Sequence, residues 1–129
     1  MRTSHSDALV VYGATGDLAH KMIFPALYAM VKRGILNVPV IGVAFPKWSL
    51  ERLQKRVAHS IKQSGGIDNK QAFRQLLSLL KYVSGDYNDS NTFAAIKKAL
   101  GKARRPAHYL AIPPSLFETV INEIGRAHV

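Results

Sequence analysis

Four short runs with the character of β-strands alternate with helical segments along this chain, and this alternation constrains the fold more than any other feature. The runs cover residues 8–12, 39–44, 81–84 and 107–112. The first of them is apolar throughout, which is typical of a strand that is buried on both faces. Because strands that alternate with helices form parallel sheets with crossover helices, we expect a single α/β domain with an open parallel sheet.

The helical segments carry their own start and stop signals. Pro25 lacks an amide hydrogen, so we expect a short, irregular turn after Gly16 and a regular helix from about Pro25 onward. Ser49 is expected to begin the next helix, and the Gly65-Gly66 pair to end it. The remaining helices are expected over residues 69–80, 91–100 and 116–124, the last capped by Ser115.

Size and composition exclude several classes of protein. The chain has 129 residues, of which 47% are hydrophobic and 20% charged, as in one compact globular domain. It has no cysteine, which excludes disulfides, a thiol nucleophile and thiolate metal sites. No apolar stretch reaches the roughly 18 residues of a membrane span. We expect a cytoplasmic protein without a membrane partner, with a flexible tail over residues 1–6 and a domain over residues 7–129.

The charge is strongly positive, at +10 from 18 Lys and Arg against 8 Asp and Glu. Such a charge attracts polyanions, so it is compatible with nucleic-acid binding, with a site for a phosphorylated small molecule and with a merely solvated basic surface. The densest basic cluster, residues 97–105, contains no aromatic side chain on which a base could stack. We therefore interpret this cluster as a solvated helix end and expect no nucleic-acid partner.

A glycine-rich turn, Gly13-Ala-Thr-Gly16, lies directly between the first strand and the first helix. Gly13 lets the chain leave the strand in a tight turn, and Gly16 lets a pyrophosphate approach the amides at the positive end of the helix. Ala19 occupies the third position of the usual fingerprint and is small enough for close packing. In this context the turn predicts a Rossmann-like dinucleotide-binding domain. The alternative is a plain strand–helix turn whose glycines serve only backbone geometry.

The end of the second strand bears on the choice between NAD and NADP. An acidic residue there binds the ribose 2′-hydroxyl of NAD, whereas an arginine binds the 2′-phosphate of NADP. Phe45 stands there instead, followed by Pro46, Lys47 and Trp48, so no carboxylate is in place. Lys47 and Arg52 offer positive charge, while Phe45 or Trp48 offers a ring for the adenine. We expect NADP as the cofactor, with NAD possible.

No catalytic or metal-binding constellation is visible in the sequence. The histidines stand at positions 5, 20, 59, 108 and 128, and no two of them have metal-ligand spacing on one helix face. His108 lies within an apolar strand and is interpreted as a packed residue rather than a base. Asp17 is interpreted as a partner of the helix dipole rather than a general acid. We therefore assign no catalytic residue and no metal site.

The segment Gly13-Ala-Thr-Gly-Asp-Leu-Ala-His-Lys21, followed by Ile23-Phe-Pro25, resembles the start of glucose-6-phosphate dehydrogenases. The Gly-Asp-Leu-Ala extension and the proline four residues after the lysine are far more specific than the two glycines. Three further segments agree in the same order, namely residues 41–49, 82–89 and 109–117. The likeness extends from about residue 7 to residue 124.

The resemblance implies that a dinucleotide lies over residues 13–20, with Phe45, Asp86, Tyr87 and Phe117 nearby. Lys47 is added to this set for its positive charge. The expected cofactor-binding residues are therefore Gly13, Ala14, Thr15, Gly16, Asp17, Leu18, Ala19, His20, Phe45, Lys47, Asp86, Tyr87 and Phe117. Two positions depart from the family. The family commonly has arginine at Phe45, which grips the 2′-phosphate, and often has a basic residue at Met22.

Members of this family are several times longer and continue into a large α+β domain that carries the catalytic histidine and the sugar-phosphate residues. The resemblance therefore implies a truncated chain that forms a single, incomplete dinucleotide-binding domain and is inactive alone. The intact enzyme would oxidise glucose 6-phosphate to 6-phosphogluconolactone, at the entry to the pentose phosphate pathway, and would form oligomers through the missing domain. The alternative functions are a separate epimerase-like or reductase-like NAD(P)-binding domain and a basic nucleic-acid-binding protein.

Overall fold

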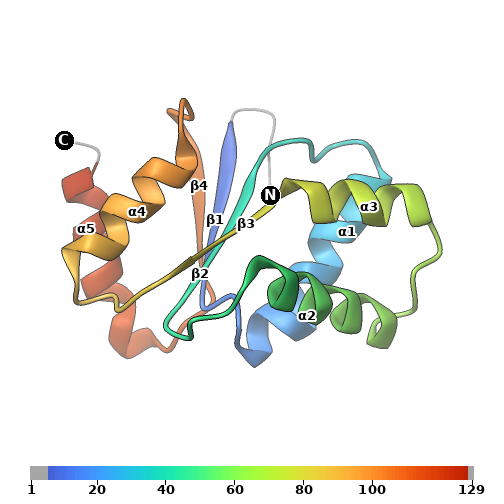
Figure 1. Cartoon of the computed structure of the whole chain (residues 1–129), viewed down its shortest axis with the longest axis horizontal. Helices are drawn as coiled ribbons and strands as arrows, with labels where there is room; N and C mark the ends of the chain where they lie inside the picture. Colours follow the sequence, from blue (N-terminus) through green and yellow to red (C-terminus); the bar gives the residue numbers. More distant parts are fainter. Residues whose placement is uncertain (1–5, 128–129) are drawn as a thin grey trace.

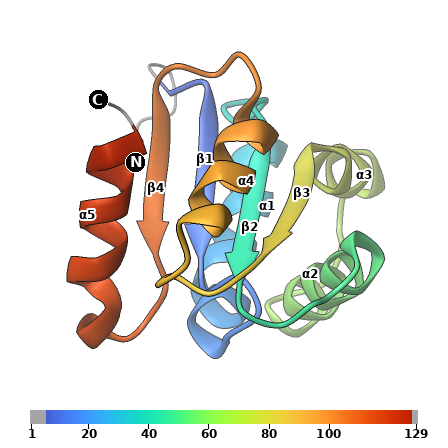
Figure 2. The same cartoon turned by 60° about the vertical axis from the view of Figure 1, so that its left-hand side comes forward.

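The computed structural model describes residues 6–127, which fold around one parallel sheet (Figure 1). Its strands are β1 (Ala8–Tyr12), β2 (Val40–Ala44), β3 (Leu80–Ser84) and β4 (Pro106–Leu110). The order across the sheet is β3-β2-β1-β4, and every pair of neighbours is parallel. The arrowheads of β2, β3 and β4 accordingly lie at the same edge (Figure 2). The expected α/β fold with an open parallel sheet is confirmed.

Helices cover both faces of this sheet, in three layers. Figure 1 shows α1 (Phe24–Lys32), α2 (Leu50–Gln63) and α3 (Lys70–Leu79) on one side, and α4 (Ser90–Leu100) and α5 (Phe117–Ala127) on the other. Side chains of β1 alternate between the two resulting cores, since Leu9 packs with α1–α3 and Val10 packs with α4 and α5. All residues of β1 and β2 are buried, which is why the first apolar run shows no polar position.

The first helix begins irregularly, as Pro25 predicts. A π-helical segment, η1 (Ala19–Ile23), precedes α1, and the Phe24 amide donates to the carbonyl of Ala19, five residues back. Pro25 then enters in the first turn of α1, where a missing amide hydrogen costs little. The widened π turn and the proline together carry the chain from the glycine-rich turn into a regular helix.

Side-chain caps begin three of the helices. Ser49 accepts a hydrogen bond from the Arg52 amide at 3.1 Å, as the sequence predicts, and Asn69 and Asp89 cap α3 and α4 in the same way. The cap predicted at Ser115 is wrong. Ser115 lies inside a 3-10 turn, η2 (Pro114–Leu116), that leads directly into α5, where the carbonyls of Pro113 and Pro114 accept the amides of Leu116 and Phe117.

The strand predicted over residues 107–112 is shifted, since β4 ends at Leu110. The amide of Ala111 still donates to the carbonyl of Tyr12, after which the proline pair turns the chain away. At the other end of β4, the Asp7 carboxylate accepts from the amides of Arg104 and Arg105 at 2.7 and 2.8 Å, and these bonds hold its pKa below the usual value. Of the tail expected over residues 1–6, residues 1–5 lie outside the described part.

Within residues 6–127, no helix is long and apolar enough to cross a membrane.

Candidate coenzyme-binding site

The glycine-rich turn lies at the point of the sheet where the strand order reverses. From β1 the chain crosses to β2 and β3 on one side, and β4 then pairs on the other side of β1. In open parallel sheets such a reversal opens a crevice beyond the carboxyl ends of the strands, where ligands bind. The turn from Gly13 to Gly16 follows β1 at this edge, so the sequence prediction of its position is confirmed.

The two glycines of the turn have different reasons for being glycine. Gly13 has φ +81°, and a Cβ there would lie 2.1 Å from the carbonyl oxygen of Ala111, in the loop after β4. The fold itself therefore requires Gly13. A Cβ on Gly16 would lie 3.4 Å from the carbonyl oxygen of Gly13, which is an ordinary contact. Packing therefore does not require glycine at this position, and its missing side chain leaves the space above the turn open to a ligand.

Hydrogen bonds hold the turn in place. The amide of Gly13 donates to the carbonyl of Val43 at 2.8 Å and to the hydroxyl of Tyr87 at 2.9 Å. The same hydroxyl donates to the carbonyl of Val43 at 3.2 Å, and the amide of Gly16 donates to the carbonyl of Gly13 at 3.0 Å. Burial raises the pKa of Tyr87, while its bond from Gly13 opposes that rise. The phenol therefore remains protonated and ties β1, β2 and the segment after β3 together.

The helix that follows the turn begins without a side-chain cap, in contrast to α2, α3 and α4. The first amides of a helix have no partner within it, and the helix dipole makes this end positive. Uncapped amides beside an open glycine turn form the usual receptor for a phosphate group. Asp17 points outward here, with 89% of its side chain exposed, and pairs with Arg56 at 3.7 Å.

The remaining predicted residues follow the carboxyl ends of the other strands, so the structure brings the whole set to one edge. Phe45, which is 71% exposed, and the exposed Lys47 follow β2. Asp86 follows β3, where its carboxylate accepts the Asn88 amide at 2.9 Å. Phe117 begins α5, after the loop that leaves β4, and is half-buried against the core of that face.

Besides Tyr87, three predicted residues have side chains that face the interior. Ala14 and Ala19 are fully buried, so any contact of theirs with a cofactor would come from the backbone. His20 is only 7% exposed, and its Nε2 lies 2.9 Å from Nδ1 of His59 on α2. No pattern in the sequence indicates this histidine pair, because the two residues are 39 positions apart and lie on different elements.

The segment after β2 is well defined. The guanidinium of Arg52 lies over the ring of Trp48, with 4.5 Å between its Cζ and the ring centroid. Tyr82 donates its hydroxyl hydrogen to the carbonyl of Pro46, and burial raises the pKa of Tyr82 to about 12. Since Arg52 already covers one face of the indole, the exposed Phe45 is the more accessible ring for an adenine.

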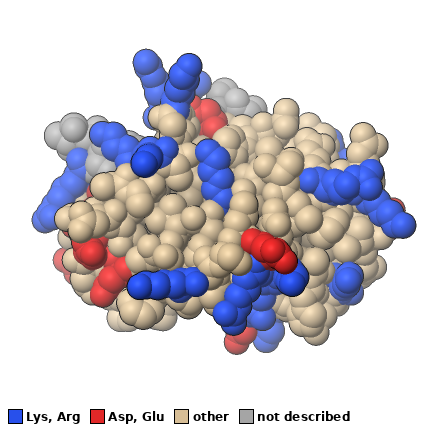
Figure 3. Space-filling view, in the orientation of Figure 1, with Lys and Arg blue, Asp and Glu red and all other residues tan. Residues whose placement is uncertain are grey.

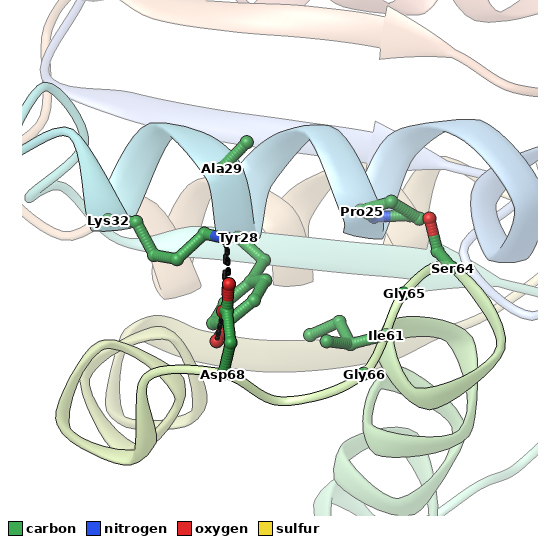
Figure 4. Close-up of a pocket in the computed structure, with 9 residues that line it drawn as sticks. All are labelled: Pro25, Tyr28, Ala29, Lys32, Ile61, Ser64, Gly65, Gly66 and Asp68. Carbon is green, nitrogen blue, oxygen red and sulfur yellow. Dashed lines mark hydrogen bonds and ion pairs between the residues drawn. The ribbon is translucent and has the colours of Figure 1, made fainter.

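A separate cavity of about 310 Å³ lies between α1, the end of α2 and the loop before α3 (Figure 4). Its polar groups bind one another: the Tyr28 hydroxyl donates to Asp68 at 2.8 Å, and Lys32 pairs with Asp68 at 3.0 Å. These bonds hold the pKa of Asp68 below its usual value. We interpret this cluster as a tie between α1 and the loop before α3.

On the face that Figure 3 shows, Lys and Arg form several separate groups with tan surface and some acidic residues between them. His108, which the sequence suggests is a packed residue, stacks on Tyr12 and shares a hydrogen bond of 3.1 Å with its hydroxyl. Among residues 6–127, no three or more His, Cys, Asp or Glu side chains gather as metal ligands do.

Comparisons with known proteins agree with this geometry. Residues 10–129 match the family described as "Glucose-6-phosphate dehydrogenase, NAD binding domain". Glucose-6-phosphate 1-dehydrogenase 1 of Mycobacterium tuberculosis is 37% identical over 124 residues, which cover 96% of this chain and 26% of that protein. The crystal structure of the Mycobacterium avium enzyme superposes with a TM-score of 0.88 at 38% identity, over 95% of this chain and 27% of that one.

A further solved structure, glucose-6-phosphate dehydrogenase in complex with its substrate glucose-6-phosphate, superposes with a TM-score of 0.82 at 30% identity. That superposition covers 96% of this chain and 28% of the other. The chain thus spans about a quarter of the length of the relatives it matches. It belongs to the glucose-6-phosphate dehydrogenase family, whose NAD binding domain it forms.

Proposed function

We propose that this chain binds NADP(H), with NAD as a weaker alternative, across the carboxyl edge of its sheet. The observation that carries the proposal is the turn from Gly13 to Gly16, which is open above Gly16 and leads into a helix without a side-chain cap. The pyrophosphate would lie on the backbone of residues 13–20, on amides near Thr15, Asp17 and Leu18. Asp86, Tyr87 and Phe117 would border it from the neighbouring loops.

The segment after β2 supports NADP over NAD. None of the residues 45–50 is acidic, so no carboxylate there would hold a ribose 2′-hydroxyl or repel a 2′-phosphate. The exposed Lys47 and the stacked Arg52 supply positive charge at the same end. Phe45 would stack on the adenine, because its exposed aromatic ring offers a flat apolar face to the base.

In the intact protein, this domain would serve the oxidation of glucose 6-phosphate to 6-phosphogluconolactone. The bound nicotinamide supplies the hydride acceptor, and the residues of this chain bind and orient the coenzyme. The names of the relatives, one of them solved with glucose-6-phosphate, support this activity. We also propose a cytoplasmic location, since the related Arabidopsis thaliana isoform is named cytoplasmic, and oligomer formation through other parts of the protein.

Thermal unfolding with and without coenzyme tests the site. A ligand that binds only the folded chain stabilises it by about 1.4 kcal/mol at ten times its Kd, or roughly 4 °C for a domain of this size. Gly16→Val should abolish the shift, because its side chain fills the space above the turn. Gly125→Val is the matched control, since a Cβ on this α5 residue meets nothing within 4 Å. Equal shifts in all three proteins would show that the turn is not the binding site.

A further inference from the structure

His20 and His59 form a close pair whose imidazole rings the proposed function does not use. His20 belongs to η1, and His59 lies on α2. Nε2 of His20 lies 2.9 Å from Nδ1 of His59, and the ring centroids are 5.1 Å apart. Two imidazole nitrogens from different elements thus lie within hydrogen-bond distance of each other.

The surroundings fix this pair in place. The hydroxyl of Ser60, next to His59, donates a hydrogen bond to the carbonyl of His20. Ser60 is 1% exposed and His20 is 7% exposed, whereas His59 is exposed to solvent. One imidazole is therefore held by the core, and its partner lies at the surface, where an ion can reach it.

Several charged groups surround the pair. Burial lowers the pKa of His20, and the charges of Arg56, His59 and Lys21 lower it further, against an opposing effect of Asp17. A histidine nitrogen must be unprotonated to ligate a metal, and a lowered pKa favours that form. Lys21 and Arg56 also repel a divalent cation, although Asp17 partly neutralises Arg56 through their 3.7 Å contact.

We propose that His20 and His59 form a two-imidazole site for a divalent transition metal such as Zn²⁺. Two nitrogens at about 2.0–2.1 Å from a tetrahedral zinc lie roughly 3.3 Å apart, so the pair needs to open by only a few tenths of an ångström. One ring must also move its hydrogen to its other nitrogen, which costs little for an imidazole.

One of the two histidines borders a cavity. This cavity of about 240 Å³ is lined by His20, Lys21, Ser60, Gln63 and Ser64, and it has room for water molecules that could serve as further ligands. Imidazole nitrogen suits Zn²⁺, Ni²⁺ and Cu²⁺ better than Mg²⁺ or Ca²⁺, which prefer oxygen. A bound ion would join η1 to α2, directly behind the glycine-rich turn, and would stabilise the folded chain.

Zn²⁺ titration of the untagged chain, in competition with a chromogenic chelator, tests the site. His5→Gln/His128→Gln serves as the background, because it removes the histidines near the termini, which lie outside the described residues. His59→Gln on this background is the test variant, and its exposed position lets the chain fold. We expect one Zn²⁺ per chain in the background and at least about tenfold weaker binding after His59→Gln.

A measurement without a site variant accompanies the titration. In the ¹⁵N spectrum of histidine-labelled chain, Zn²⁺ should shift the ring nitrogens of His20 and His59 and leave those of His108 unchanged. The absence of saturable binding, equal affinity after His59→Gln, or shifts at His108 instead of the pair would each overturn the proposal. None of these outcomes depends on coenzyme binding, so the proposal stands or fails separately from the function proposed above.

Discussion

The hydroxyl of Tyr87 accepts the amide hydrogen of Gly13 at 2.9 Å, across 74 positions of the sequence. Gly13 directly follows β1, and Tyr87 lies in the segment after β3, two strands away in the sheet. The same hydroxyl donates to the carbonyl of Val43 on β2, the strand between β1 and β3. A single buried phenol thus helps the backbone bonds to hold the turn that we propose binds the pyrophosphate.

Tyr87→Phe should therefore weaken both the fold and the site. Losing these hydrogen bonds should lower the free energy of unfolding by about 1 kcal/mol, measured by urea denaturation. The amide of Gly13 keeps its bond to Val43, which limits the loss. NADP affinity should fall as well, because the turn loses its support. An unchanged unfolding midpoint would show that the phenol packs without contributing through its hydroxyl.

Gly13→Ala and Gly16→Ala should differ sharply in stability. Gly13→Ala forces an alanine into a left-handed conformation and against the carbonyl of Ala111, so we expect a loss of more than about 2 kcal/mol. Gly16→Ala meets only an ordinary contact and should change stability by less than about 1 kcal/mol. Thermal and urea unfolding measure both. Similar losses would contradict the separate roles assigned to the two glycines.

Phe45→Arg should shift coenzyme preference toward NADP. A guanidinium after β2 can bind the 2′-phosphate through two charge-assisted hydrogen bonds, so the ratio of NADP to NAD affinity should rise about tenfold. Lys47→Ala is the opposite variant and should lower NADP affinity while leaving NAD affinity nearly unchanged. Isothermal titration with each coenzyme gives both ratios. If neither variant alters the ratio, the 2′-phosphate lies elsewhere.

The stability of the chain should fall as the pH drops below about 6.5, through protonation of His20. Burial lowers the pKa of His20 in the folded chain from the ordinary 6.5, so the unfolded chain takes up the proton first. The stabilisation is thus complete above pH 6.5 and is lost as the pH falls through the lower pKa of the folded state. His20→Gln should flatten this part of the pH profile, measured by urea unfolding. Asp7 and Asp68, whose pKa values lie below 3.8, titrate outside this window.

The 129-residue chain alone should not reduce NADP with glucose 6-phosphate. Proton removal needs a base within about 2.6–3.2 Å of the reacting group, and binding only the coenzyme forfeits the gain from holding both reactants together. Absorbance of NADPH, with sugar phosphate and coenzyme at high concentration, measures the rate. Turnover above the buffer rate that copurifies with the chain through two columns would reveal a catalytic group at this edge.

The sequence by itself determined the succession of elements and the place of the turn. The apolar run before Gly13, the proline in the first helix and the cap at Ser49 act within a few residues, so their effects can be read locally. The alternation of strands and helices then leaves few topologies besides a parallel sheet with crossover helices. Ser115 misled the local prediction because the preceding prolines had already supplied a backbone acceptor.

Only the tertiary structure decided which side chains meet. The need for glycine at position 13 comes from the carbonyl of Ala111, and the histidine pair comes from the packing of η1 against α2. Both depend on how strands and helices far apart in the sequence are aligned, and that alignment follows from filling the two cores on either side of the sheet. Contacts of this kind have no local pattern, because their energy comes from close packing between distant segments.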